Sequence, residues 1–186
     1  MNVEHIKEAV SETLLSIQFD EFEVDEVKRI FDQWSDVTFL EEFFHNNYDD
    51  LNGDFYKMAS VDEAVLKTLS YAKDFSKLLK SSALGENGRN LNDLFRPYNK
   101  HSTEKIRERS KARGVEPRSW LRLYAIRLDD NLFVITGGAI KLTFKMDRDH
   151  LEMEDKKMDI VAGYFKSEKI DSKNDYCFID FDGDEE

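Results

Sequence analysis

The chain of 186 residues contains few of the residues that cross-link a fold or interrupt its helices and strands. It contains one cysteine, Cys177, with two prolines and eight glycines. A single cysteine excludes a disulfide within the chain and a zinc site built from several cysteines. So few prolines and glycines favour regular elements joined by short loops. No apolar run reaches the length of about 18 residues that a membrane-spanning helix needs, so we expect no membrane partner.

The N-terminal residues Met1–Gln18 carry Glu4, Glu8 and Glu12 and lack a basic segment followed by an apolar stretch. This pattern is not typical of a secretory signal. Together with the low cysteine content it predicts a cytoplasmic protein. The four histidines are scattered, and a surface role suits each of them better than metal binding. We therefore expect no metal and no cofactor.

Charge is distributed unevenly along the chain, whose net charge is −12. Residues 1–60 carry 4 basic and 15 acidic side chains, a net charge of −11. Residues 96–148 carry 13 basic and 6 acidic side chains, a net charge of +7. Blocks of opposite sign can pair with each other, or each can bind a different partner. The sequence leaves both arrangements open.

Apolar residues recur with helical spacing through the first half of the chain. Ser60 and Glu63 form a capping box, which predicts the start of a long helix. A second kind of helix is expected near Ile106, where cations surround very few apolar residues, so that it would be exposed and mobile. The expected helices are Asn2–Gln18, Val24–Trp34, Thr38–Asn47, Val61–Ser81, Ser102–Arg113 and Asp149–Phe165.

The spacing changes to an alternation of two after Ser119, which indicates strands. We expect turns at 129–131 and at Gly137-Gly138. Both faces of the first strand are mostly apolar, which predicts a central position in the sheet. The expected strands are Trp120–Leu128, Leu132–Thr136, Ala139–Phe144 and, after the last helix, Tyr176–Phe181.

This order of elements predicts an α+β fold. An acidic N-terminal helical layer, residues 1–58, would precede a small antiparallel sheet flanked by helices, residues 59–186. The sequence does not decide between one domain and two. The expected core residues are Phe31, Trp34, Phe43, Leu69, Phe75, Trp120, Leu123, Val134, Ile140 and Phe165.

Basic side chains gather on and beside the predicted sheet, interleaved with aromatic rings. Cations bind phosphates and planar rings stack on bases, so this pattern favours RNA as a ligand. The candidate catalytic residues are Arg122, Lys141 and Lys145, because cations stabilise charge that develops on phosphorus during RNA cleavage. The candidate nucleic-acid-binding residues are Lys111, Arg113, Arg118, Tyr124 and Arg127. Alternatively, these cations pair with the acidic N-terminal helices.

The stretch Leu121–Met146 and the glutamate-rich helix after it resemble the end of the RelE/ParE/HigB-type toxins. In that family an arginine-bearing strand is followed by a turn, an apolar strand and a K-K-T-x-K segment. Lys141, Thr143 and Lys145 match that segment, with Leu142 in place of its second lysine. The resemblance extends from about Val61 to Phe165 and has no counterpart for the acidic N-terminal region.

Two functions follow as expectations. The resemblance implies a toxin–antitoxin-type protein, possessing metal-independent ribonuclease activity, that acts on RNA or the ribosome and has a cognate antitoxin. The alternative is a non-enzymatic interaction module whose acidic faces bind a basic protein, as an antitoxin, an immunity protein or a phage inhibitor does.

Overall fold

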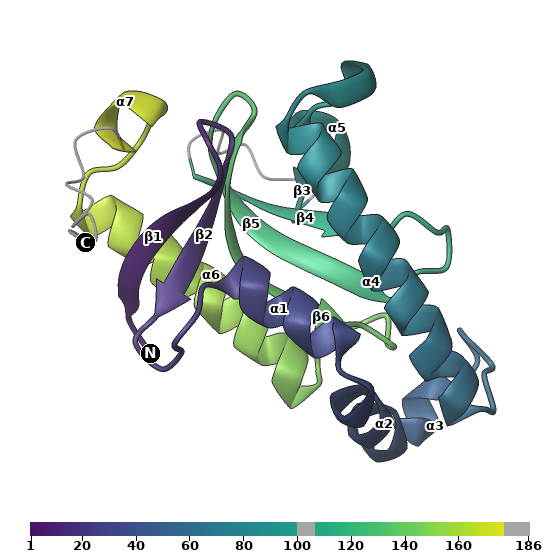
Figure 1. Ribbon diagram of the computed structural model, residues 1–186. Coiled ribbons are helices and arrows are strands. Elements are labelled where there is room, and N and C mark those ends of the chain that lie inside the picture. Colours follow the sequence, from purple (N-terminus) through teal and green to yellow (C-terminus); the bar gives the residue numbers. More distant parts are fainter. Residues whose placement is uncertain (100–106, 177–186) are drawn as a thin grey trace.

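A computed structural model of the chain describes residues 1–99 and 107–176. It centres on a six-stranded sheet with the strand order β1-β2-β6-β5-β4-β3 (Figure 1). Neighbouring strands are antiparallel except β2 and β6, which are parallel. The strands are β1 Val3–Val10, β2 Leu14–Phe19, β3 Arg96–Pro97, β4 Glu108–Arg113, β5 Leu121–Asp129 and β6 Leu132–Ile140.

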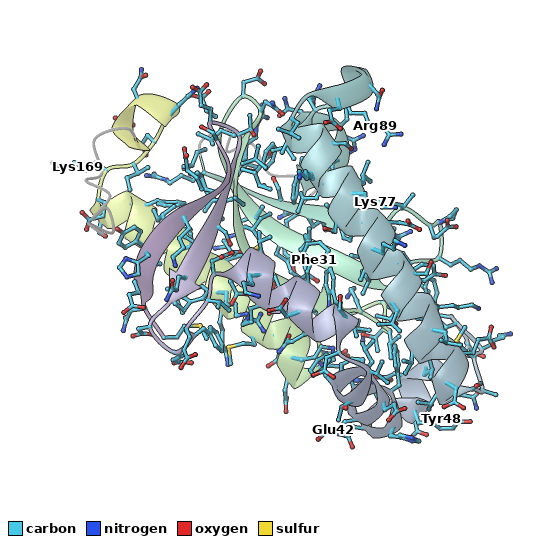
Figure 2. The ribbon with its side chains drawn as sticks, in the orientation of Figure 1. Phe31, Glu42, Tyr48, Lys77, Arg89 and Lys169 are labelled. Carbon is cyan, nitrogen blue, oxygen red and sulfur yellow. The ribbon has the colours of Figure 1, made fainter. Side chains whose placement is uncertain are left out.

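Helices cover both faces of this sheet (Figure 1). One apolar cluster joins the sheet to Trp34 of α1 and Phe75 of α4, and Figure 2 shows Phe31 between these two helices. A second cluster joins the opposite face to Met158 and Phe165 of α6. The helices are α1 Glu26–Ser35, α2 Val37–Asn46, α3 Tyr48–Leu51, α4 Val61–Ala83, α5 Leu91–Leu94, α6 Asp149–Ser167 and α7 Lys173–Tyr176, with a 3₁₀ turn, η1, at Glu86–Gly88.

The predicted α+β fold is therefore confirmed, with helices on both sides of a mostly antiparallel sheet. The cap predicted at Ser60 is also confirmed, and Asp25 caps α1 in the same way. The Ser60 hydroxyl accepts a hydrogen bond from the Glu63 amide, and the Asp25 carboxylate accepts one from the Lys28 amide, each 3.2 Å long. These bonds satisfy amides that have no partner inside the first turn of a helix. Within the described residues, no helix is long and apolar enough to cross a membrane.

The helix predicted over Asn2–Gln18 is wrong, because this segment forms the hairpin of β1 and β2. The chain turns at Glu12, whose φ of 66° is incompatible with a continuous helix. Every residue of β2 is buried, since the strand lies between β1 and β6 and is covered on both faces. The apolar residues of this segment mimic helical spacing because few residues of the edge strand β1 are buried, whereas β2 is buried along its whole length.

The helix predicted over Ser102–Arg113 is also wrong where the structure describes it, because Glu108–Arg113 forms β4. Residues 102–106 lie outside the described part of the chain. Ser110 and Ala112 are buried while the intervening cations face the other way. Buried and more exposed residues therefore alternate along this segment, as expected for a strand and not for a helix.

The predicted turn at Gly137-Gly138 is wrong, since β6 runs unbroken through both glycines and ends at Ile140. The two glycines instead let helices approach the sheet from both sides. A Cβ atom on Gly137 would overlap the Glu154 carboxylate of α6, and one on Gly138 would lie 3.1 Å from the Ile30 side chain of α1. Strand glycines mark such close approaches as well as turns.

Most of the predicted core is confirmed. Seven of the ten residues are buried. Phe31, Phe43 and Leu69 are partly buried and pack against the apolar cluster that contains Trp34 and Phe75. The predicted strand Tyr176–Phe181, which includes Cys177, lies outside the described residues except for Tyr176, the last residue of α7.

Candidate functional site

A groove of about 1,020 Å³ opens beside β3, β4 and the start of β5. Aromatic side chains line it together with basic ones, and Asp93 is the one carboxylate among its described lining residues. We call it the basic groove. Its cations are Arg89, Arg96, Lys111, Arg113, Arg122 and Lys141. Its rings are Phe55, Tyr56, Tyr98, Tyr124 and Phe144.

Strand register brings four of these cations together. Arg96 lies opposite Lys111 across β3 and β4, and Arg113 lies opposite Arg122 across β4 and β5. Residues paired in this way point to the same face of a sheet. Arg89, labelled in Figure 2, lies just after α4 and approaches the groove from a different part of the chain.

Arg113 and Arg122 form a directly opposed pair of like charges, an arrangement that destabilises a sheet. Arg122 is only 8% exposed, and its Nη1 donates to the carbonyl oxygens of Ser119 and Leu121 at 2.7 and 2.8 Å. Burial lowers the pKa of Arg122, and the charge of Arg113 lowers it further. In residues 1–99 and 107–176, no carboxylate lies within 4 Å of the charged nitrogens of either arginine.

Lys141 extends this positive cluster from the segment after β6. Burial lowers the pKa of its ammonium group, and the charges of Arg122 and Lys111 lower it further. Its Nζ donates to the carbonyl oxygen of Lys145 at 2.6 Å. The Tyr56 hydroxyl donates to the Lys141 carbonyl at 3.3 Å, which ties this segment to the chain ahead of α4.

Aromatic rings form one rim of the groove. Phe144 is 79% exposed and Phe55 is 41% exposed, and their ring centroids lie 4.6 Å apart edge to face. Phe55 also meets Tyr56 at 4.6 Å, and Tyr56 packs at 5.2 Å on the buried ring of Trp120. The Trp120 indole donates to the Thr68 hydroxyl of α4 at 2.9 Å. The rim is thus anchored to the core.

Two tyrosines form another part of the wall. The Tyr98 hydroxyl donates to Asp155 of α6 at 2.5 Å, and Lys111 Nζ lies 5.0 Å from the centroid of the Tyr98 ring. Burial is the main cause of the raised pKa of Tyr98 and Tyr124. Both phenols therefore keep their protons at neutral pH and present neutral rings to a ligand.

The structure brings together five of the eight residues predicted from the sequence: Lys111, Arg113, Arg122, Tyr124 and Lys141. The other three lie elsewhere. Arg118 is exposed in the turn before β5, and Arg127 pairs with Asp130 at 3.1 Å at the far end of that strand. The exposed Lys145 contributes a carbonyl oxygen, not its ammonium group, to the bonds around Lys141.

Of the other basic and aromatic residues of the groove, Arg96 and Tyr98 belong to the group around the sheet but are not among the predicted site residues. Sequence reasoning missed four altogether: Phe55, Tyr56, Arg89 and Phe144. Phe144 could have been found, because it lies three residues after Lys141 in the same segment. The others come from the loops on either side of α4, and no local pattern connects those loops to the sheet.

Three cations outside the groove have carboxylate partners. Arg148 forms a bidentate pair with Asp50 at 2.8 Å, Arg109 pairs with Asp159, and Lys157 pairs with Glu26. No residue of 1–54, all of which the structure describes, lines the groove. Residues 1–54 therefore leave the groove uncovered, and Phe55 and Tyr56, which follow them, line it.

Metal chemistry has no evident centre in the described chain. No group of three or more His, Cys, Asp or Glu side chains in residues 1–99 and 107–176 is placed to hold a metal ion.

The chain matches no protein-family model, no curated protein and no solved structure in comparisons with all three. The character of the groove is therefore the basis for a functional proposal.

Proposed function

We propose that the protein binds RNA, with the phosphates of the RNA held in the basic groove. The observation that carries this proposal is the opposed pair of Arg113 and Arg122, which has no carboxylate partner in the described chain. A bound phosphate between or beside two such cations removes their repulsion and adds charge-assisted hydrogen bonds.

The distribution of the cations along the groove favours a chain-like ligand. The cations come from several separate elements, so they offer successive contacts to a polyanion. The net charge of −12 on the whole chain repels RNA from other surfaces and directs it to the groove.

The test is binding of a fluorescently labelled RNA, measured by anisotropy across a salt series. Arg113→Glu reverses a charge inside the groove, and Arg127→Glu reverses one on the same sheet outside it. We expect Arg113→Glu to abolish most binding and Arg127→Glu to leave it largely intact. Affinity should fall steeply as salt increases, because bound phosphates release condensed counterions. Equal losses in the two variants, or binding insensitive to salt, would refute the proposal.

RNA cleavage is a separate prediction for the same surface. Two of the three candidate catalytic residues, Arg122 and Lys141, line the groove, and Tyr56 lies between them and the aromatic rim. Cations at this position would stabilise charge on a reacting phosphate. Incubation of RNA with the protein in the presence of a chelator, followed by a denaturing gel, measures metal-independent cleavage. Intact RNA at every time point would leave binding as the function and reject the nuclease.

A further inference from the structure

The aromatic rim gives the proposed RNA ligand a more specific form. Phe144 has the largest exposed fraction among the exposed large apolar residues of the described chain, at 79%. It lies beside Phe55 on the rim of a groove rich in cations. Large exposed rings beside cations are what stacking platforms for unpaired bases consist of.

The ring cluster is held in place from beneath. Phe55 contacts Tyr56, and Tyr56 rests on Trp120, which is buried and hydrogen-bonded to α4. Ordering a free side chain against a ligand costs conformational entropy, and a supported ring has less of that freedom to lose. The rim is preorganised for a planar partner.

Phosphate and base contacts lie on one short segment of chain. Lys141 belongs to the cation cluster, and Phe144 follows it by three residues. The Tyr56 hydroxyl bonds to the backbone of Lys141. A strand whose phosphate lies at Lys141 therefore has its neighbouring base close to the rim.

We propose that the groove takes single-stranded RNA, with unpaired bases stacked on Phe55 and Phe144 while the cations hold the phosphates. This inference rests on the proposed function. In a duplex the faces of the bases are covered by their neighbours, and only backbone and groove edges are accessible to side chains. The rim therefore discriminates between single strands and duplexes, which the cations alone do not do.

The experiment compares a single-stranded oligouridine of about 12 nucleotides, a length typical of single-strand sites, with an RNA duplex of the same length. Phe144→Ala should weaken oligouridine binding roughly five- to hundredfold and change duplex binding by less than about twofold. The salt dependence should stay that of the unmodified protein, since no charge is removed. Phe144→Trp should restore binding, because tryptophan presents a larger stacking surface.

Leu66→Ala is the matched control, as Leu66 is 68% exposed on α4 and does not line the groove. It should leave both affinities unchanged. Equal binding of both RNAs, with no effect of Phe144→Ala, would overturn the stacking inference and leave the proposed function standing. Absence of salt-dependent binding of either RNA would overturn both.

Discussion

Lys157 on α6 and Glu26 on α1 form a buried ion pair of 2.9 Å although their helices pack on opposite faces of the sheet. The pair lies beside the place where the sheet divides. Strand β2 pairs with β6 only at Leu14–Ser16, and the two strands then separate. Glu154 joins the pair at 3.0 Å from Lys157, above the bare backbone of Gly137. This cluster links the three layers of the fold.

Gly137→Ala should destabilise the protein by roughly 1–3 kcal/mol, a typical cost of overpacking a buried site. The added methyl group would overlap the Glu154 carboxylate. Gly163→Ala on α6 is the control, since its Cβ would meet nothing within 4 Å. We expect that variant to be more stable by roughly 0.5–1 kcal/mol, because alanine favours the helix. Urea denaturation measures both, and a neutral Gly137→Ala would show that Glu154 is free to move aside.

Glu154 should make stability fall as the pH rises. Burial raises the pKa of its carboxyl from 4.5 to about 7, and its Oε2 has no hydrogen-bond partner in the described chain. Between these two values only the folded state keeps the proton, so the folded state is favoured below pH 4.5 and loses that advantage as the pH rises through about 7.

Glu154→Gln removes this titration. Relative to that variant, the unmodified protein should lose roughly 1–3 kcal/mol of unfolding free energy between pH 4.5 and neutrality. Denaturant midpoints of the two proteins measured side by side test the difference, in which other titrating groups cancel. Parallel pH profiles would mean that Glu154 is ionised at its ordinary pKa.

The variants Lys141→Ala and Lys145→Ala should differ in how their RNA affinity depends on salt. Lys141 lines the basic groove, whereas Lys145, four residues later, does not. For single-stranded RNA, removing one phosphate contact should lower the magnitude of the slope of log affinity against log salt by about 0.7. We expect this change for Lys141→Ala and no change for Lys145→Ala. The same slope for both variants would place the bound phosphates outside the groove.

Ile140→Ala should destabilise the protein by roughly 2–5 kcal/mol, because it leaves a cavity where a buried side chain was packed. Ile140 is 3% exposed at the end of β6. Leu66→Ala, at an exposed site, should stay within about 0.5 kcal/mol of the unmodified protein. Thermal or urea unfolding compares the two, and a cost below that limit at Ile140 would contradict its place in the core.

The sequence predicted those features that local chemistry decides. The cap at Ser60 and the apolar character of both faces of β5 are visible over a few residues, and each is present in the structure. The helix predicted over Asn2–Gln18 failed because β2 is buried on both faces by partners distant in the sequence. Single-sequence periodicity contains no information on such partners.

The residues of the groove were likewise predictable where they belong to neighbouring strands, and not where they come from distant loops. Arg113 and Arg122 belong to adjacent strands, so their meeting follows once β4 is recognised as a strand. The alternation of Arg109, Lys111 and Arg113 with two small residues was the available signal for that strand. Phe55 and Tyr56 reach the groove only through the packing of the loop before α4 on Trp120.

The parallel pairing of β2 with β6 has a consequence for biosynthesis. Leu14 and Phe133, which lie opposite each other, are made at widely separated times as the ribosome extends the chain. The N-terminal hairpin emerges early with the apolar residues of β2 unpaired on one edge, and it must wait for β6 before the sheet closes. Such distant pairing slows folding and exposes strand edges to aggregation. The nascent chain is thus most vulnerable, and most in need of a chaperone, between the synthesis of these two strands.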